Sequence, residues 1–272
     1  MSPLITVDGL RGLSEVPVLI DVTWNLSGPP GKEAYDAGHL PGAHFVDLDT
    51  ELAGPPGPGR HPLPEATTVT VTLRRAGVSA DSSVVVYDAA NSMAAARAWW
   101  IFRYFGLSDV RVLDGGLAAW QAAGGELTTD VPADGAGTFT ATAGHLPMLD
   151  ADGAADVAAA GVLLDARAPE RFAGEVEPMD PVAGHIPGAT NAPTTANVGE
   201  TGHFLPAADL RERFAKLGVE PTTEVGVYCG SGVTAAHEAL ALELTGIQAP
   251  VYIGSWSEWI TDPTRPVATG AD

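Results

Sequence analysis

Short runs of apolar residues alternate along the chain with longer segments in which apolar residues recur at helical spacing. Residues 18–22 and 225–229 are two of the short runs, and residues 208–217 form a helical segment with Gly218 as its expected end. An apolar run suits a strand that is buried on both faces, and parallel strands must be joined by crossovers. The pattern therefore predicts an α/β fold in which parallel sheets are flanked by helices on both faces.

The same pattern contains an internal repeat. Four blocks of the first half recur in the same order in the second half: residues 18–22 with 162–166, 38–43 with 184–189, 84–88 with 225–229, and 114–120 with 253–259. Each unit is longer than the repeats of solenoid proteins, so the chain is interpreted as a tandem duplication. We expect two domains, residues 1–137 and 138–272, that join near the small, glycine- and proline-containing residues 131–138.

Composition narrows the classes of partner and compartment. The 272 residues carry a formal net charge of −20, which disfavours binding to nucleic acid or to an anionic membrane. No apolar stretch is long enough to span a bilayer, and the first residues lack the basic and apolar runs of a signal peptide. One cysteine allows no intrachain disulfide, so we expect a cytoplasmic protein. The seven histidines are scattered and there is no cysteine pair, so no metal site is expected.

The candidate reactive group is the lone cysteine, Cys229. An apolar run leads into it, Gly230 and Gly232 follow, and residues 235–244 have the pattern of a helix. Glycines let backbone N–H groups turn inward, and a helix N-terminus adds unpaired N–H groups and partial positive charge. A thiolate is stabilised by such surroundings. A lone cysteine is often an inert core residue, but such a residue needs neither the glycines nor the helix start, so the loop favours a nucleophile.

A cysteine in such a loop also occurs in cysteine-dependent phosphatases. Those enzymes hold phosphate with an arginine six positions after the cysteine, where this chain has Ala235. No cation lies in residues 229–236. Phosphate-ester chemistry is therefore less favoured than transfer of a smaller group.

Residues 229–234, with the sequence Cys-Gly-Ser-Gly-Val-Thr, resemble the active-site loop of the two-domain rhodanese superfamily, in the form found in 3-mercaptopyruvate sulfurtransferases. The resemblance implies two tandem rhodanese-like domains. It implies that Cys229 takes sulfur from 3-mercaptopyruvate as a persulfide and passes it to a thiol or to cyanide, without an organic cofactor. The residues implied to bind the substrate and hold the charge through backbone N–H groups are Gly230, Ser231, Gly232, Val233 and Thr234.

The resemblance also assigns residues outside the loop. Arg171 matches the arginine that binds the anionic group of the substrate, with Arg167 as a weaker candidate. A guanidinium offers two parallel donors to a carboxylate or a sulfonate. The family's second arginine, nine positions after the first, is replaced here by Asp180, so a two-arginine clamp would need another cation.

A further implied group comprises Ser231, His61 and Asp49. In the family a loop serine is paired with a histidine and an aspartate from the first domain, and these are the matching residues of this chain. An aspartate that orients an imidazole, which in turn polarises a hydroxyl, is suited to activating a carbonyl or thiol. His39 and His185 occupy equivalent positions in both repeats, so they are interpreted as structural.

The repeat provides an internal comparison for the nucleophile. Asp88 stands in the first half where Cys229 stands in the second, and the residues after it lack glycine. A carboxylate cannot carry sulfane sulfur, so the first domain is expected to be catalytically silent.

Two other functions remain open at this point. Thiosulfate is an alternative donor, although a doubly charged donor calls for more cations than Arg171 alone provides. A persulfide carrier or binding module without turnover is the other alternative. The expected partners are a small anionic sulfur donor and a thiol acceptor, such as thioredoxin or a low-molecular-weight thiol.

Overall fold

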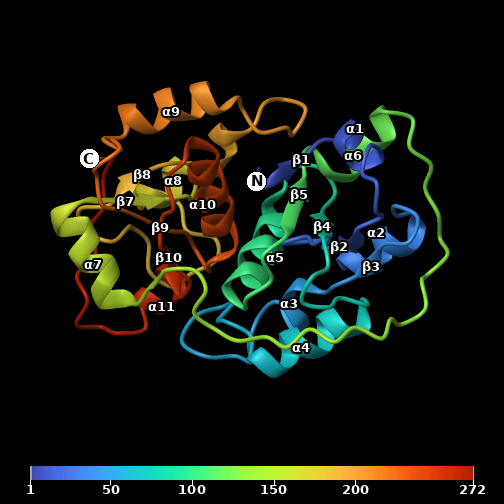
Figure 1. Ribbon diagram of the computed structural model, residues 1–272. Coiled ribbons are helices and arrows are strands. Elements are labelled where there is room, and N and C mark those ends of the chain that lie inside the picture. Colours follow the sequence, from blue (N-terminus) through green and yellow to red (C-terminus); the bar gives the residue numbers. More distant parts are fainter. Residues whose placement is uncertain (1, 272) are drawn as a thin grey trace. The chain divides into compact units, whose positions relative to one another are not determined.

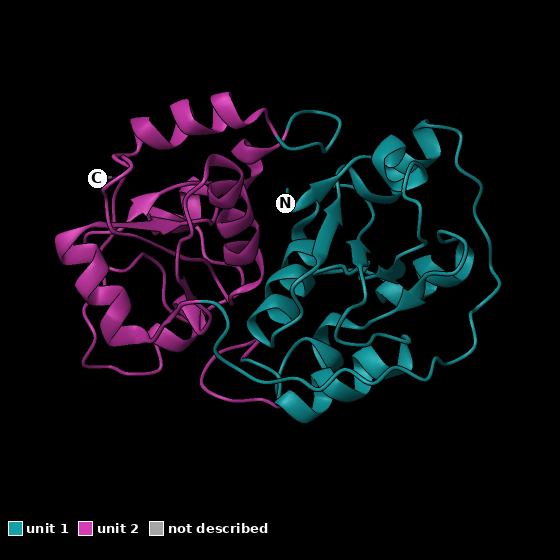
Figure 2. Ribbon diagram, viewed as in Figure 1, with its two compact units in different colours: residues 1–54, 63–146, 199–204 teal, residues 55–62, 147–198, 205–272 magenta. Residues whose placement is uncertain are grey.

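The computed structural model describes residues 2–271 and divides into two compact units. Figure 2 shows unit 1, residues 1–54, 63–146 and 199–204, and unit 2, residues 55–62, 147–198 and 205–272. Two short segments are thus exchanged between the halves of the sequence. Residues 55–62 come from the first half but belong to unit 2, and residues 199–204 come from the second half but belong to unit 1.

Unit 1 contains a five-stranded parallel sheet with the strand order β1-β5-β4-β2-β3. Its strands are β1 (Leu4–Ile5), β2 (Val18–Asp21), β3 (His44–Phe45), β4 (Val84–Tyr87) and β5 (Val110–Leu113). Its helices are α1 (Val7–Arg11), α2 (Gly31–Ala37), α3 (Leu48–Glu51), α4 (Ala66–Arg75), α5 (Met93–Tyr104) and α6 (Gly116–Ala122). The residues after position 137 still pack on this unit, because the N–H groups of Phe139 and Thr142 donate to the carbonyls of Val78 and Phe105.

Unit 2 repeats this arrangement with the strand order β6-β10-β9-β7-β8, again parallel. Its strands are β6 (Met148–Leu149), β7 (Val162–Asp165), β8 (Thr190–Asn191), β9 (Val225–Tyr228) and β10 (Val251–Tyr252). Its helices are α7 (Ala151–Ala160), α8 (Pro169–Phe172), the 3-10 helix η1 (Thr194–Asn197), α9 (Ala207–Lys216), α10 (Val233–Thr245) and α11 (Ser255–Trp259).

The fold class expected from the sequence is confirmed, because each unit is a parallel sheet flanked by helices. In unit 2, α7 packs against β7 and α10 against β9, as Figure 1 shows. The central strands β4 and β9 are buried at every residue, which explains why they lack polar alternation. The residue directly after the central strand is the candidate nucleophile Cys229 in unit 2 and its counterpart Asp88 in unit 1.

The two equivalent histidines of the repeat have the same structural role. His39 stacks on Tyr35 and His185 on Phe172, each with 3.7 Å between ring centroids. The Nδ1 atom of each ring lies 2.8 Å from the backbone carbonyl oxygen of its stacking partner. Both histidines are buried, so their interpretation as structural residues is confirmed.

Within residues 2–271, no helix is long and apolar enough to cross a membrane. The same residues contain no group of three or more histidine, cysteine, aspartate or glutamate side chains arranged to hold a metal ion.

Candidate active site

Cys229 lies at the carboxyl end of the central strand of unit 2, in a loop that leads into α10. Its side chain is buried, and the N–H of Gly232 donates to its Sγ atom at 3.0 Å. Gly232 adopts a φ of 80°, a left-handed conformation that a residue with a side chain adopts only with strain. The helix then begins at Val233, so its N-terminal dipole favours negative charge near the sulfur.

Ser255, at the start of α11, supports Cys229 through its hydroxyl. Its Oγ atom accepts the N–H of Cys229 at 3.1 Å, lies 3.9 Å from Sγ, and donates to the carbonyl of Tyr252 at 2.8 Å. Ser255 has a φ of 54°, and the equivalent residue of unit 1 is Gly116, with a φ of 56°. The hydroxyl is thus kept at a position where glycine would be unstrained. Ser255 was not among the residues expected from the sequence, although the repeat alignment placed serine opposite glycine.

The structure brings Ser231 and His61 together. The Nδ1 atom of His61 lies 2.8 Å from the Ser231 Oγ atom. His61 reaches this place because residues 55–62 fold with unit 2, where the N–H of Arg60 donates to Ser257 Oγ at 3.1 Å. Gly59 also approaches Gly254 so closely that a Cβ on Gly59 would lie 3.2 Å from the Gly254 carbonyl oxygen. The catalytic roles of Ser231 and His61 stay predictions.

Asp49 belongs to unit 1, in helix α3. Both of its carboxylate oxygens lie 3.1 Å from the indole Nε1 of Trp24, which donates to them. The predicted part of Asp49 in orienting His61 stays a prediction.

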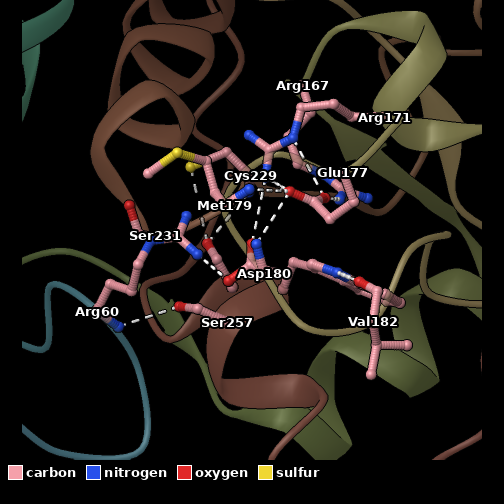
Figure 3. Close-up of polar contacts among 12 residues, drawn as sticks. Arg60, Arg167, Arg171, Glu177, Met179, Asp180, Val182, Cys229, Ser231 and Ser257 are labelled. Atoms are coloured by element: carbon pink, nitrogen blue, oxygen red, sulfur yellow. Dashed lines mark hydrogen bonds and ion pairs between the residues drawn. The ribbon is translucent and has the colours of Figure 1, made fainter. Parts of the chain in front are cut away.

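Arg171 lies in α8 and is held by two carboxylates. Its Nε donates to Glu177 Oε2 at 3.2 Å, and one terminal nitrogen donates to Glu177 Oε1 at 2.7 Å and to Asp180 Oδ2 at 3.2 Å. Figure 3 shows these residues gathered near Cys229.

Arg167 has a different position. Its side chain is 1% exposed, and its guanidinium contacts the carboxylate of Asp165 at 2.6 Å and lies over the ring of Trp256. Burial opposes the charged form, but Asp165 outweighs it, so the pKa of Arg167 is raised. Its donors are used by Asp165, by the carbonyl of Gly184 and by Glu177, so Arg167 is not available to a donor anion.

Arg60 is a cation that sequence reasoning did not identify. Its guanidinium forms an ion pair with Asp180, and a Cβ on Gly230 would lie 2.8 Å from one of its terminal nitrogens. The same Cβ would lie 3.5 and 3.6 Å from the terminal nitrogens of Arg171. Two guanidinium groups therefore lie against Gly230, next to Cys229. Burial and the positive charge of Arg171 lower the pKa of Arg60, whereas the Cys229 sulfur opposes that shift. The only sequence signal was a cation directly before His61.

The loop of unit 1 that is equivalent to the Cys229 loop surrounds the carboxylate of Asp88. The carboxylate of Asp88 accepts four backbone N–H groups, from Ala90, Ser92, Ala94 and Ala95, at 3.0 to 3.2 Å. Burial raises the pKa of Asp88, although these hydrogen bonds act to lower it. A strand, loop and helix start of this kind therefore direct several N–H groups to one point. In unit 2 the N–H of Gly232 points at the sulfur of Cys229, at 3.0 Å.

Comparison with known proteins identifies the family of this chain. The family described as "Rhodanese-like domain" matches residues 7–123 and 149–262, which is one match in each half of the chain. The chain is 48% identical to the "Probable 3-mercaptopyruvate sulfurtransferase" of Pseudomonas aeruginosa, over 98% of each chain. It is 47% identical to the "Putative thiosulfate sulfurtransferase SseB" of Mycobacterium tuberculosis, over 98% of this chain and 97% of that protein.

The fold has a close counterpart among solved structures. The crystal structure of SseA from Escherichia coli, described as a 3-mercaptopyruvate sulfotransferase, superimposes with a TM-score of 0.84 and 32% identity. The match covers 94% of this chain and 99% of SseA. With two domain matches and relatives of nearly half identity along the whole length, this chain belongs to the rhodanese family and carries two of its domains in tandem.

Proposed function

We propose that this protein is a sulfurtransferase that takes sulfur from 3-mercaptopyruvate through a persulfide on Cys229. The observation that carries the proposal is the N–H of Gly232 directed at Cys229 Sγ, in a loop whose counterpart in unit 1 surrounds the Asp88 carboxylate with four N–H groups. Such preorganised donors stabilise charge that develops during a reaction. The relatives named 3-mercaptopyruvate sulfurtransferase support the choice of donor.

The reaction has two steps. The Cys229 thiolate attacks the sulfur of 3-mercaptopyruvate, a sulfur–sulfur bond forms, and the carbon–sulfur bond breaks with its electron pair going to carbon. The product is the enolate of pyruvate, and the proton of the donor thiol ends on its methyl carbon. A nucleophilic acceptor then attacks the outer sulfur and regenerates the Cys229 thiolate. The sum is a ping-pong transfer.

Ser231 is given the role of a hydrogen-bond donor to the carbonyl oxygen of the donor molecule. Its hydroxyl lies 2.8 Å from His61 Nδ1, so the imidazole holds the hydroxyl in one orientation. Arg60 and Arg171 are proposed to bind the carboxylate of the donor, because both guanidinium groups lie beside Gly230. Asp49 is proposed as the residue that orients His61.

Thiosulfate is a second candidate donor. Two guanidinium groups beside the loop, rather than Arg171 alone, give a dianion more attraction than the sequence indicated. The name of the relative from Mycobacterium tuberculosis points to the same donor. For the acceptor we propose a thiol, such as thioredoxin or a low-molecular-weight thiol, in the cytoplasm, where a lone cysteine stays reduced.

The test compares kcat/KM for 3-mercaptopyruvate and for thiosulfate with one acceptor, and measures persulfide on the protein by mass spectrometry. Cys229→Ser should abolish both turnover and the added sulfur atom, whereas Asp88→Ala should leave the added sulfur atom in place. Equal loss in both variants would contradict the assignment of a silent unit 1. Stoichiometric sulfur loading without turnover would indicate a carrier instead of an enzyme.

A further inference from the structure

Asp180 pairs with both of the guanidinium groups that lie beside Gly230. One of its oxygens pairs with Arg60, and the other accepts from Arg171 at 3.2 Å. A single carboxylate therefore bridges two guanidinium groups, and its side chain is only 4% exposed. Figure 3 shows Asp180 between the two arginines.

The charges of this cluster cancel. Arg60 and Arg171 supply two positive charges, and Glu177 and Asp180 supply two negative charges. The two carboxylates have different roles. Glu177 fixes Arg171 through two nitrogens and also accepts the N–H groups of Met179 and Asp180, at 3.0 and 3.2 Å, so it shapes the segment. The Asp180 carboxylate instead pairs with the guanidinium groups of Arg60 and Arg171.

We propose that Asp180 selects the sulfur donor by charge: it competes for the guanidinium groups of Arg60 and Arg171, and it opposes a dianionic donor more than a monoanionic one. This inference rests on the proposed function and adds a specificity-determining residue to it. A donor anion that reaches the two arginines lies within contact distance of the Asp180 carboxylate. The repulsion scales with the charge of the donor.

The size of the effect follows from Coulomb's law. With the strong screening of bulk water, each unit of donor charge at contact distance changes affinity by roughly tenfold, and a lower effective dielectric constant makes the change larger, so tenfold is the lower end of the expected effect. Removing the Asp180 charge should therefore raise the affinity for a monoanionic donor about tenfold and the affinity for a dianionic donor about a hundredfold. The ratio of the two affinities, dianion to monoanion, should therefore rise about tenfold.

The experiment measures kcat/KM for thiosulfate and for 3-mercaptopyruvate in the wild type and in Asp180→Asn. The matched control is Asp152→Asn, which makes the same change of charge at an exposed residue of α7 paired with Arg265. We expect the thiosulfate-to-mercaptopyruvate ratio to rise about tenfold in Asp180→Asn and to change less than about twofold in Asp152→Asn. An unchanged ratio in Asp180→Asn, or an equal rise in both variants, overturns the proposal.

A second variant covers the case in which Asp180→Asn does not fold. Arg60→Gln removes one positive charge and leaves Asp180 in place, so the same ratio should fall about tenfold. A loss of the same size for both donors would show that charge does not discriminate between them, and would refute the proposal.

A binding measurement separates this proposal from the proposed function. Cys229 is alkylated with the neutral reagent iodoacetamide, and protection by sulfate is compared with protection by pyruvate. Asp180→Asn should strengthen sulfate protection about tenfold more than pyruvate protection, whether or not sulfur is turned over. If Asp180→Asn shows this shift in protection but the wild type turns over neither donor, only the proposed reaction is refuted. If the wild type turns over a donor but Asp180→Asn shows no shift, only the role of Asp180 is refuted.

Discussion

The absence of a side chain at Gly230 leaves the space that the Arg60 guanidinium uses. A Cβ at this position would lie 2.8 Å from a terminal nitrogen of Arg60 and at least 3.5 Å from those of Arg171. The backbone of Gly230 lies outside the left-handed region, so alanine fits its conformation. In Gly230→Ala the Arg60 guanidinium must therefore retreat, by about 0.7 Å to reach an ordinary contact distance, while Arg171 can stay.

The expected cost falls on donor binding. A hydrogen bond to a charged group contributes about 1.5 to 3 kcal/mol, and partial exposure of Arg60 reduces the effect to about 1.4 kcal/mol. KM for the donor should therefore rise about tenfold. The free energy of unfolding should change by less than about 1 kcal/mol, because alanine lowers the entropy of the unfolded chain and offsets the displaced ion pair.

The assay is donor kinetics combined with urea denaturation, and Gly199→Ala is the control. No atom lies within 4 Å of a Cβ at Gly199, and its φ is not left-handed either. The decisive comparison adds Arg60→Ala: once the guanidinium is gone, Gly230→Ala should have little further effect on KM. An unchanged KM in the single variant, or the same loss in both backgrounds, would refute the reasoning.

Two further predictions concern stability. Ser255→Gly and Ser255→Ala both remove the hydroxyl that accepts the N–H of Cys229, but only alanine keeps a side chain at a φ of 54°. Ser255→Ala should therefore be less stable than Ser255→Gly by about 1 kcal/mol in urea denaturation, and equal stabilities would argue against backbone strain at this residue. Asp114 accepts the N–H of Phe204 at 2.9 Å, and burial raises its pKa above 3.8 although this bond lowers it. The folded protein keeps the Asp114 carboxyl protonated at pH values at which the unfolded chain has lost that proton. The contribution of Asp114 to the free energy of unfolding therefore falls as the pH rises above 3.8. Asp114→Asn should remove this slope in urea denaturation at several pH values, and a slope that persists would exclude Asp114 as its source.

The features that the sequence determined are local. Apolar runs at strand spacing and helical periodicity depend on neighbouring residues, so the amino-acid order alone was enough to identify the parallel sheets and the repeat. The same applies to the loop at Cys229, because strand, glycines and helix start are contiguous and fix where the N–H groups point. The identity of Asp88 at the equivalent position also followed from the repeat alone.

The features that only the tertiary structure decided are contacts between residues far apart in the chain. Arg60 and Asp180 are separated by 120 positions, and no periodic pattern links them. They meet because residues 55–62 leave the first half of the sequence to fold with unit 2. The same fold commits Arg167 to Asp165 and leaves Arg171 beside Gly230, although both arginines were candidates in the sequence. Which cation faces the sulfur depends on long-range packing and on competing carboxylates, and a local pattern encodes neither.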